Sequence, residues 1–165
     1  MADLSELQKL LDRAAHEMPN KVLRIIGVEG KNFIAKNFRD EGFTDTSTQK
    51  WEERKTEDKQ GHDITRYRTS RRGKAGNLNR YGSKNKDRAI LTGFGTGGDK
   101  LRNSFKRRID LGSKKVVLYT YKEYAQRHNE GLDGMPKRQF MGKSNYLDTQ
   151  IYKKIEKKLN ELLKK

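Results

Sequence analysis

Apolar residues recur every three or four positions near the N-terminus, which is the period of an amphipathic helix. Pro19 should end this first helix, because proline lacks the N–H that an interior helical position donates. A second helix is expected over residues 21–40. Gly27 and Gly30 inside it indicate either a close backbone contact or a break. The apolar stripe of the first helix consists of Leu4, Leu7, Leu11, Ala14 and Met18.

The second half of the chain changes to a two-residue period, which is typical of strands. Residues 103–111 alternate well, and residues 116–121 are β-branched and aromatic. The residues between these segments, 111–114, suit a hairpin turn. Residues 89–91 form a further short apolar run. Together these segments predict an antiparallel sheet of three or four strands.

Helical periodicity returns at the C-terminus. Residues 122–129 suit one or two helical turns that end before Gly131. Ser144 can cap a longer helix, whose expected buried stripe is Leu147, Ile151, Ile155, Leu159 and Leu162. The predicted class is α+β, with N-terminal helices, an antiparallel sheet of three to four strands, a C-terminal helix and a long basic loop. Residues 1–165 are expected to form a single domain.

Composition limits the size of the core and indicates a partner. Of 165 residues, 32% are hydrophobic and 36% are charged, and the net charge is +16 with a pI near 10.0. Such a charge favours an anionic partner: nucleic acid, an acidic protein surface or an anionic membrane. The absence of cysteine excludes disulfides and thiolate zinc sites. The N-terminus lacks the layout of a signal peptide, and no stretch approaches the roughly 20 apolar residues that span a bilayer.

Residues 43–88 form a polar arm that becomes strongly basic at Arg66. Two interpretations remain open: a solvated flexible arm, or an arm that orders against an anionic surface or a neighbouring subunit. Trp51 is expected to anchor the arm to the core, with an interface role as the second interpretation. The candidate contacts to DNA or another anionic partner are Arg66, Arg68, Arg71, Arg72, Lys74, Arg80, Lys84, Lys86 and Arg88.

Motifs for catalysis or metal binding do not emerge from the sequence. Residues 93–98 match G-x-G-x-x-G, but no parallel βαβ unit surrounds them, so a flexible connection is the better interpretation. His16, His62 and His128 lie far apart and show no metal-ligand spacing. The sequence therefore predicts no enzyme activity, no metal site and no cofactor.

Several short segments occur in an order that resembles the phage virion morphogenesis family, the tail-completion proteins of Mu-like phages. The similarity extends from about Asn32 to the C-terminus. One departure is the glycine-rich insertion between two of the segments. The segments are Asn37–Arg39, Trp51, Ile90–Gly93, Leu101–Ser104, Tyr124–Ala125 with His128 and Gly131, and Pro136–Gly142.

The resemblance implies a structural virion protein of the neck or tail end, present in the host cytoplasm during assembly. It further implies a closed ring, a hexamer or dodecamer, around phage DNA. The other expected partners are portal or adaptor proteins and tail-tube or terminator proteins, without a membrane. The alternative is a stand-alone protein that binds nucleic acid without sequence preference. The candidate subunit interface comprises Trp51, Tyr124, His128, Pro136, Arg138 and Phe140.

Overall fold

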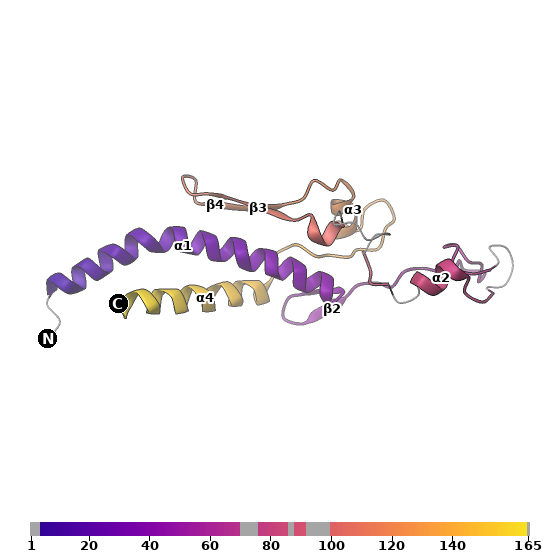
Figure 1. The fold of residues 1–165 in the computed structure, drawn as a ribbon, viewed down its shortest axis with the longest axis horizontal. Coiled ribbons are helices and arrows are strands. Elements are labelled where there is room, and N and C mark those ends of the chain that lie inside the picture. Colours follow the sequence, from indigo (N-terminus) through magenta and orange to yellow (C-terminus); the bar gives the residue numbers. More distant parts are fainter. Residues whose placement is uncertain (1–3, 70–75, 86–87, 92–99, 165) are drawn as a thin grey trace.

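The computed structural model describes residues 4–69, 76–85, 88–91 and 100–164 (Figure 1). The α+β class is confirmed. The long helix α1 lies between α4 on one side and the β3–β4 hairpin on the other, as Figure 1 shows. In chain order the elements are α1 (Leu4–Arg39), β1 (Gly42–Thr44), β2 (Thr48–Lys50), α2 (Arg80–Asn85), the 3-10 turn η1 (Leu101–Asn103), β3 (Lys106–Asp110), β4 (Lys115–Tyr119), α3 (Tyr124–Glu130) and α4 (Asn145–Leu163).

Helix α1 is continuous through Pro19, so the expectation of two N-terminal helices is wrong. An interior proline costs about 3 kcal/mol because it removes one backbone hydrogen bond and crowds the preceding turn. Packing offsets this cost: Ala14 before the proline and Leu23 after it are both buried. The helix is visibly bent in Figure 1, which is a usual consequence of an interior proline. It ends where Glu41 adopts a left-handed conformation with φ of 49°.

Gly27 and Gly30 allow the β3–β4 hairpin to lie close to α1. A Cβ at Gly27 would lie 3.2 Å from Cδ of Arg107, and one at Gly30 would overlap the Leu118 side chain. The choice that the sequence left open is therefore resolved in favour of a close backbone contact. The two glycines reduce helix propensity, and the packing of the hairpin compensates for that loss.

The strands form two separate pairs rather than one sheet of three or four strands. Strand β1 pairs with β2, and β3 pairs with β4, both antiparallel. The turn at residues 111–114 is confirmed. Residues 89–91 are not a strand: Leu91 has a positive φ of 57°, which ends the extended conformation, and Ile90 is buried as an anchor of the core.

The C-terminal helix agrees closely with the sequence pattern. Ser144 caps α4, and its Oγ accepts a hydrogen bond from the Leu147 backbone N–H at 3.1 Å. Leu162 is buried, but Leu159 remains 37% exposed, so its expected burial is wrong. Helix α4 packs against α1 along one side only.

The core lies where the C-terminal half of α1 meets the segments that follow it in the chain. Phe38 contacts three other rings at its centre, with centroid distances of 5.5 Å to Trp51, 5.1 Å to Phe140 and 6.0 Å to Phe105. The short helix α3 contributes Ala125 and ends at Gly131 in the left-handed conformation, as expected. This cluster is small, consistent with the low hydrophobic content of the chain.

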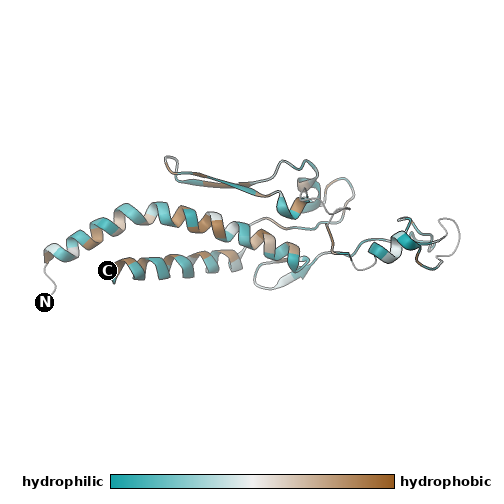
Figure 2. Cartoon of the chain, viewed as in Figure 1, coloured by the Kyte–Doolittle hydropathy of each residue, from teal (hydrophilic) through white to brown (hydrophobic). Residues whose placement is uncertain are grey.

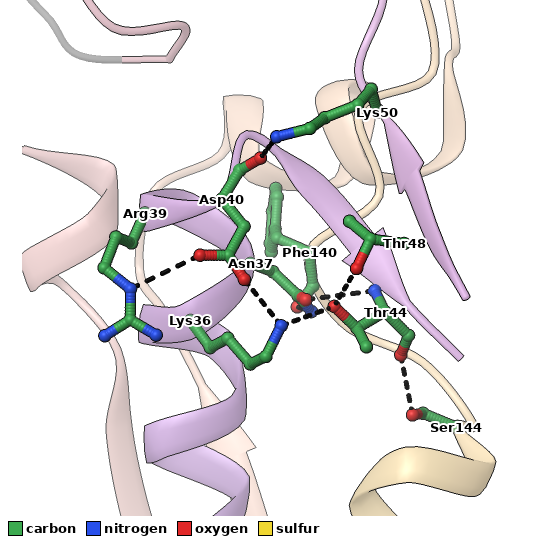
Figure 3. A network of polar contacts seen from close by, with 9 residues as sticks. All are labelled: Lys36, Asn37, Arg39, Asp40, Thr44, Thr48, Lys50, Phe140 and Ser144. Atoms are coloured by element: carbon green, nitrogen blue, oxygen red, sulfur yellow. Dashed lines mark hydrogen bonds and ion pairs between the residues drawn. The ribbon is translucent and has the colours of Figure 1, made fainter. Parts of the chain in front are cut away.

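A buried polar junction joins the end of α1 to the rest of the body (Figure 3). Asn37 is fully buried; its Nδ2 donates to the Phe140 carbonyl at 3.2 Å, and its Oδ1 accepts from the Thr44 N–H at 3.1 Å. Ser144 Oγ donates to the Thr44 carbonyl at 2.8 Å. Nearby, the hydrogen bond from Lys36 to Asp40 holds the pKa of that carboxyl below its usual range. One asparagine therefore connects α1, β1 and the segment that leads into α4.

Candidate functional site

The arm expected at residues 43–88 consists of two parts. Residues 42–50 form the β1–β2 pair on the body, while α2 and the chain around it project beyond the end of α1 (Figure 1). This projection is mainly hydrophilic (Figure 2). Its two sides are hydrogen-bonded to each other, from the Thr69 N–H to the Asn77 carbonyl and from the Asn79 N–H to the Tyr67 carbonyl, each at 3.0 Å. The described part of the arm is thus a folded-back ribbon.

Asp63 organises the first turn of the arm and is only 3% exposed. Its Oδ1 accepts hydrogen bonds from the Thr65 N–H at 2.8 Å and hydroxyl at 2.6 Å, and its Oδ2 accepts from the Arg68 N–H at 2.7 Å. Desolvation is the largest single influence and opposes ionisation, but these hydrogen bonds together lower the pKa of Asp63. A charged carboxylate at this position stabilises the turn.

Asn79 plays a similar role on the returning side of the arm. Its Nδ2 donates to the carbonyls of Arg66 and Arg68, at 2.7 Å and 2.9 Å, and its Oδ1 accepts from the Gly82 N–H at 2.8 Å. The last bond caps α2. A Cβ at Gly82 would overlap the Tyr67 carbonyl. Gly82 therefore allows α2 to pack closely against the backbone at Tyr67.

The arm cations differ in their surroundings. Arg66, Arg80 and Lys84 are exposed. Arg68 instead pairs with Glu57 at 3.2 Å and donates to the Gly76 carbonyl at 3.2 Å, so it holds the two sides of the ribbon together. Arg88 is half-buried at the base of the arm. The other candidates, Arg71, Arg72, Lys74 and Lys86, lie outside the described residues.

An open groove of about 820 Å³ lies where the arm joins the body. Its walls carry both charges: Glu41 and Glu53 face the same space as Arg54, Arg68 and Arg88. Opposite charges in one groove compensate each other, so this groove has less attraction for an anion than the exposed cations of the ribbon.

Three of the six candidate interface residues are buried inside the subunit. Trp51 is 6% exposed, and its Nε1 donates to the Gln139 carbonyl at 2.7 Å; Phe140 is 2% exposed. Arg138 is 7% exposed and donates to the carbonyls of Glu52 and Glu53 at 3.0 to 3.2 Å. The expectation that these three form a subunit interface is corrected, because Trp51 and Arg138 already join the base of the arm to the body and Phe140 packs inside the core.

The other three interface candidates are more accessible. Tyr124 is 43% exposed, and Pro136 is partly exposed. His128 is half-buried; its Nδ1 is covered and has no hydrogen-bond partner among the described residues. Burial, together with the positive charge of Arg138, lowers the pKa of His128. Tyr124 and Pro136 therefore remain available to a neighbour, whereas His128 faces partly inward.

A second basic surface, formed by residues that were not among the candidates, lies on the outer face of β3–β4. Lys106 and Arg108 are exposed there, and the Lys106 ammonium lies 5.4 Å from the ring centroid of Tyr121, which is 75% exposed. Tyr119 contacts the same ring at 5.3 Å. The alternation in residues 103–111 did indicate that Lys106 and Arg108 share a face, and the nearby tyrosines were the missed signal.

Comparison with known proteins provides no relative for this chain: no family model, curated protein or solved structure matches it. Among the described side chains, no three His, Cys, Asp or Glu groups lie close enough to hold a metal ion. Within the same residues, neither long helix has an apolar stretch sufficient to cross a membrane.

Proposed function

We propose that this chain is a structural protein of a phage particle, located at the neck or tail end and assembled as a ring around the DNA channel. In this role the body supplies contacts between subunits, and the basic arm contacts DNA or an acidic neighbouring protein. No catalytic step is part of the proposal.

This proposal is supported most directly by the packing of the family-like segments against one another in the core. Segments that are distant in sequence contribute Phe38, Trp51, Leu101, Ala125 and Phe140 to one core cluster. A chance resemblance in separate loops would not require these residues to meet. Their common packing indicates that the ordered segments specify one structural unit, as expected for a shared fold.

The distribution of charge is a second support. A ring of subunits that each carry +16 would repel itself unless anions neutralise the charge. The exposed Arg66, Arg80 and Lys84 extend away from the body on the arm, where they can reach such an anion. Phage DNA in the channel, or an acidic face on an adjoining ring, would supply that neutralisation.

Purified virions provide the main test. The protein should be present in mature particles at roughly a few to a dozen copies, as one or two closed rings require. Quantitative mass spectrometry of particles, calibrated against the major tail proteins, measures this number. Absence from mature particles would refute the proposal and leave at most a role in assembly.

The role of the arm can be tested by removing its exposed cations. If DNA is the partner, a variant with Ser at Arg66, Arg80 and Lys84 should show a log–log salt slope shallower by up to about 2.7, at about 0.9 per phosphate. A matched control that replaces Lys153, Lys154 and Lys157 on α4 removes the same charge elsewhere and should retain the slope. Equal changes in both variants would show that only net charge matters.

If the arm contacts an acidic neighbour, the same arm variant should bind DNA normally and fail to join tails to heads. Arg68, which the sequence grouped with these cations, is unsuitable for either test. Its pair with Glu57 holds the ribbon together, so its replacement would disturb the fold of the arm.

The second candidate function is nucleic-acid binding outside a particle. The exposed Lys106 on β3 and Tyr121 just after β4 favour it, because cations beside exposed rings suit both phosphates and stacked bases. Salt-sensitive binding by a protein that is absent from virions would support this function over the first.

A further inference from the structure

Helix α1 extends beyond the end of its partner helix. The Arg13 guanidinium donates to the carbonyl of Leu162, near the last residue of α4, at 3.3 Å. The preceding residues of α1, Leu4 to Asp12, therefore continue past α4 for about 13 Å at 1.5 Å per residue (Figure 1). This free end is well away from the arm and from the core.

The free end carries the same apolar stripe that packs against α4 further along. Ala14 is buried at 7% exposure, whereas Leu11 is 53% exposed and Leu4 is 83% exposed, and all three share one helix face. The apolar stripe continues along the helix, but α4 does not extend far enough to pack against its N-terminal part. Leucines repeated on one face of a helix indicate a packing surface.

Helix α4 has a matching exposed stripe. Tyr152, Leu159 and Leu163 follow one another at helical spacing beside the buried face, with exposed fractions of 74%, 37% and 41%. Tyr152 is therefore largely uncovered in the subunit, whereas Leu159 and Leu163 are partly covered. The subunit thus presents one uncovered helix end and one partly uncovered helix side.

The charge of the free end indicates that a second copy of the chain covers these surfaces. In a chain of net charge +16, residues 4–18 are slightly acidic, with three carboxylates against two cations, so another copy attracts this segment. These charges are Glu6, Asp12, Glu17, Lys9 and Arg13.

We propose that the free end of α1 in one copy packs on the exposed stripe of α4 in the next copy. The contact joins two different surfaces, so it repeats from copy to copy and can close into a ring. This contact would join neighbouring subunits in the ring of the proposed function, and the inference rests on that function.

Two variants, each damaging one side of the contact, test this inference on the full chain. The first replaces Leu4 and Leu11 by Gln; the second replaces Tyr152 and Leu163 by Gln. The control replaces Lys9 and Lys153, exposed cations away from the two stripes, by Gln. Sedimentation velocity measures the assembly state, and circular dichroism confirms that each variant keeps its helical content.

Wild type and control should form oligomers, and each stripe variant alone should be a monomer. An equimolar mixture of the two stripe variants should form a dimer and no larger species, because one intact α1 end meets one intact α4 stripe. A monomeric wild type, a stripe variant that assembles normally, or a mixture that stays monomeric would each overturn the inference.

This outcome is separable from the test of the proposed function. If virions contain the protein but the stripe variants assemble normally, the α1–α4 contact is wrong and the virion role stands. If the variants and their mixture behave as expected but virions lack the protein, the contact stands and the virion role fails.

Discussion

Replacement of Asn37 by Ala should destabilise the protein more than any other single change in the polar junction. The Asn37 side chain satisfies two buried groups, the Thr44 N–H and the Phe140 carbonyl. Each group left without a partner costs about 1 to 3 kcal/mol, so the expected loss is about 2 to 6 kcal/mol in the free energy of unfolding. That is a large share of the 5 to 15 kcal/mol typical of a folded domain.

Asn37→Asp separates hydrogen bonding from shape. An ionised Asp still accepts from the Thr44 N–H, but it cannot donate to the Phe140 carbonyl, and its charge is buried. Burial raises the pKa of such a carboxyl above its unfolded value of about 3.9. The protonated form can donate again, so the stability of this variant is present at low pH and is lost as pH rises through its folded pKa. Its deficit relative to wild type should therefore shrink on acidification from neutral pH.

Urea unfolding monitored by fluorescence of the buried Trp51 measures both effects at each pH, always against wild type. Asn32→Ala, on an exposed position of the same helix, is the matched control and should change stability by less than about 0.5 kcal/mol. A loss below about 1 kcal/mol in Asn37→Ala, or a deficit of Asn37→Asp that does not change with pH, would refute this account of the junction.

Three further predictions concern other parts of the molecule. Leu162→Asp should unfold the chain because it buries a charge, whereas Leu159→Asp, at a 37% exposed position, should keep its helical content. Equal melting temperatures of the two variants would contradict this prediction. Gly82→Ala should speed amide hydrogen exchange in the arm without lowering the melting temperature of the body, since the added Cβ would overlap the Tyr67 backbone, which is itself part of the arm. Unchanged exchange would show that α2 tolerates the methyl group. The pKa of His128 is lowered by burial, so on acidification the unfolded state binds a proton first and the stability of the protein falls as pH drops below about 6.5. His128→Gln should flatten this pH dependence of the melting temperature between pH 7 and 5, and an unaltered dependence would assign it to other groups.

Elements defined by neighbouring residues could be predicted from the sequence. The α4 helix combines an apolar stripe with a cap at Ser144, and the turn between β3 and β4 follows from the alternation on either side of it. The end of α3 at Gly131 requires only a residue that tolerates positive φ. These signals lie within a few positions of one another, so the local chain contains all the information that they need.

For the candidate site, the sequence identified the basic arm but not the roles of its members. Arg68 and Arg66 look alike in sequence. Only the structure shows that Arg68 pairs with Glu57, eleven positions away, while Arg66 faces solvent. Trp51 was correctly expected to anchor the arm, because a large aromatic ring in a polar segment favours burial wherever a core is within reach.

Other features depend on which element covers which face, and only the tertiary structure decides that. Pro19 remains inside α1 because both halves of the helix have packing partners, which outweighs a local cost of about 3 kcal/mol. Gly30 marks a close contact because the hairpin lies over it, and Leu159 stays exposed because α4 is covered on one side only. Local preferences are worth about 1 kcal/mol or less per residue, whereas burial of one large side chain is worth about 1.5 to 3 kcal/mol. Where the two disagree, contacts between distant parts of the chain determine the result.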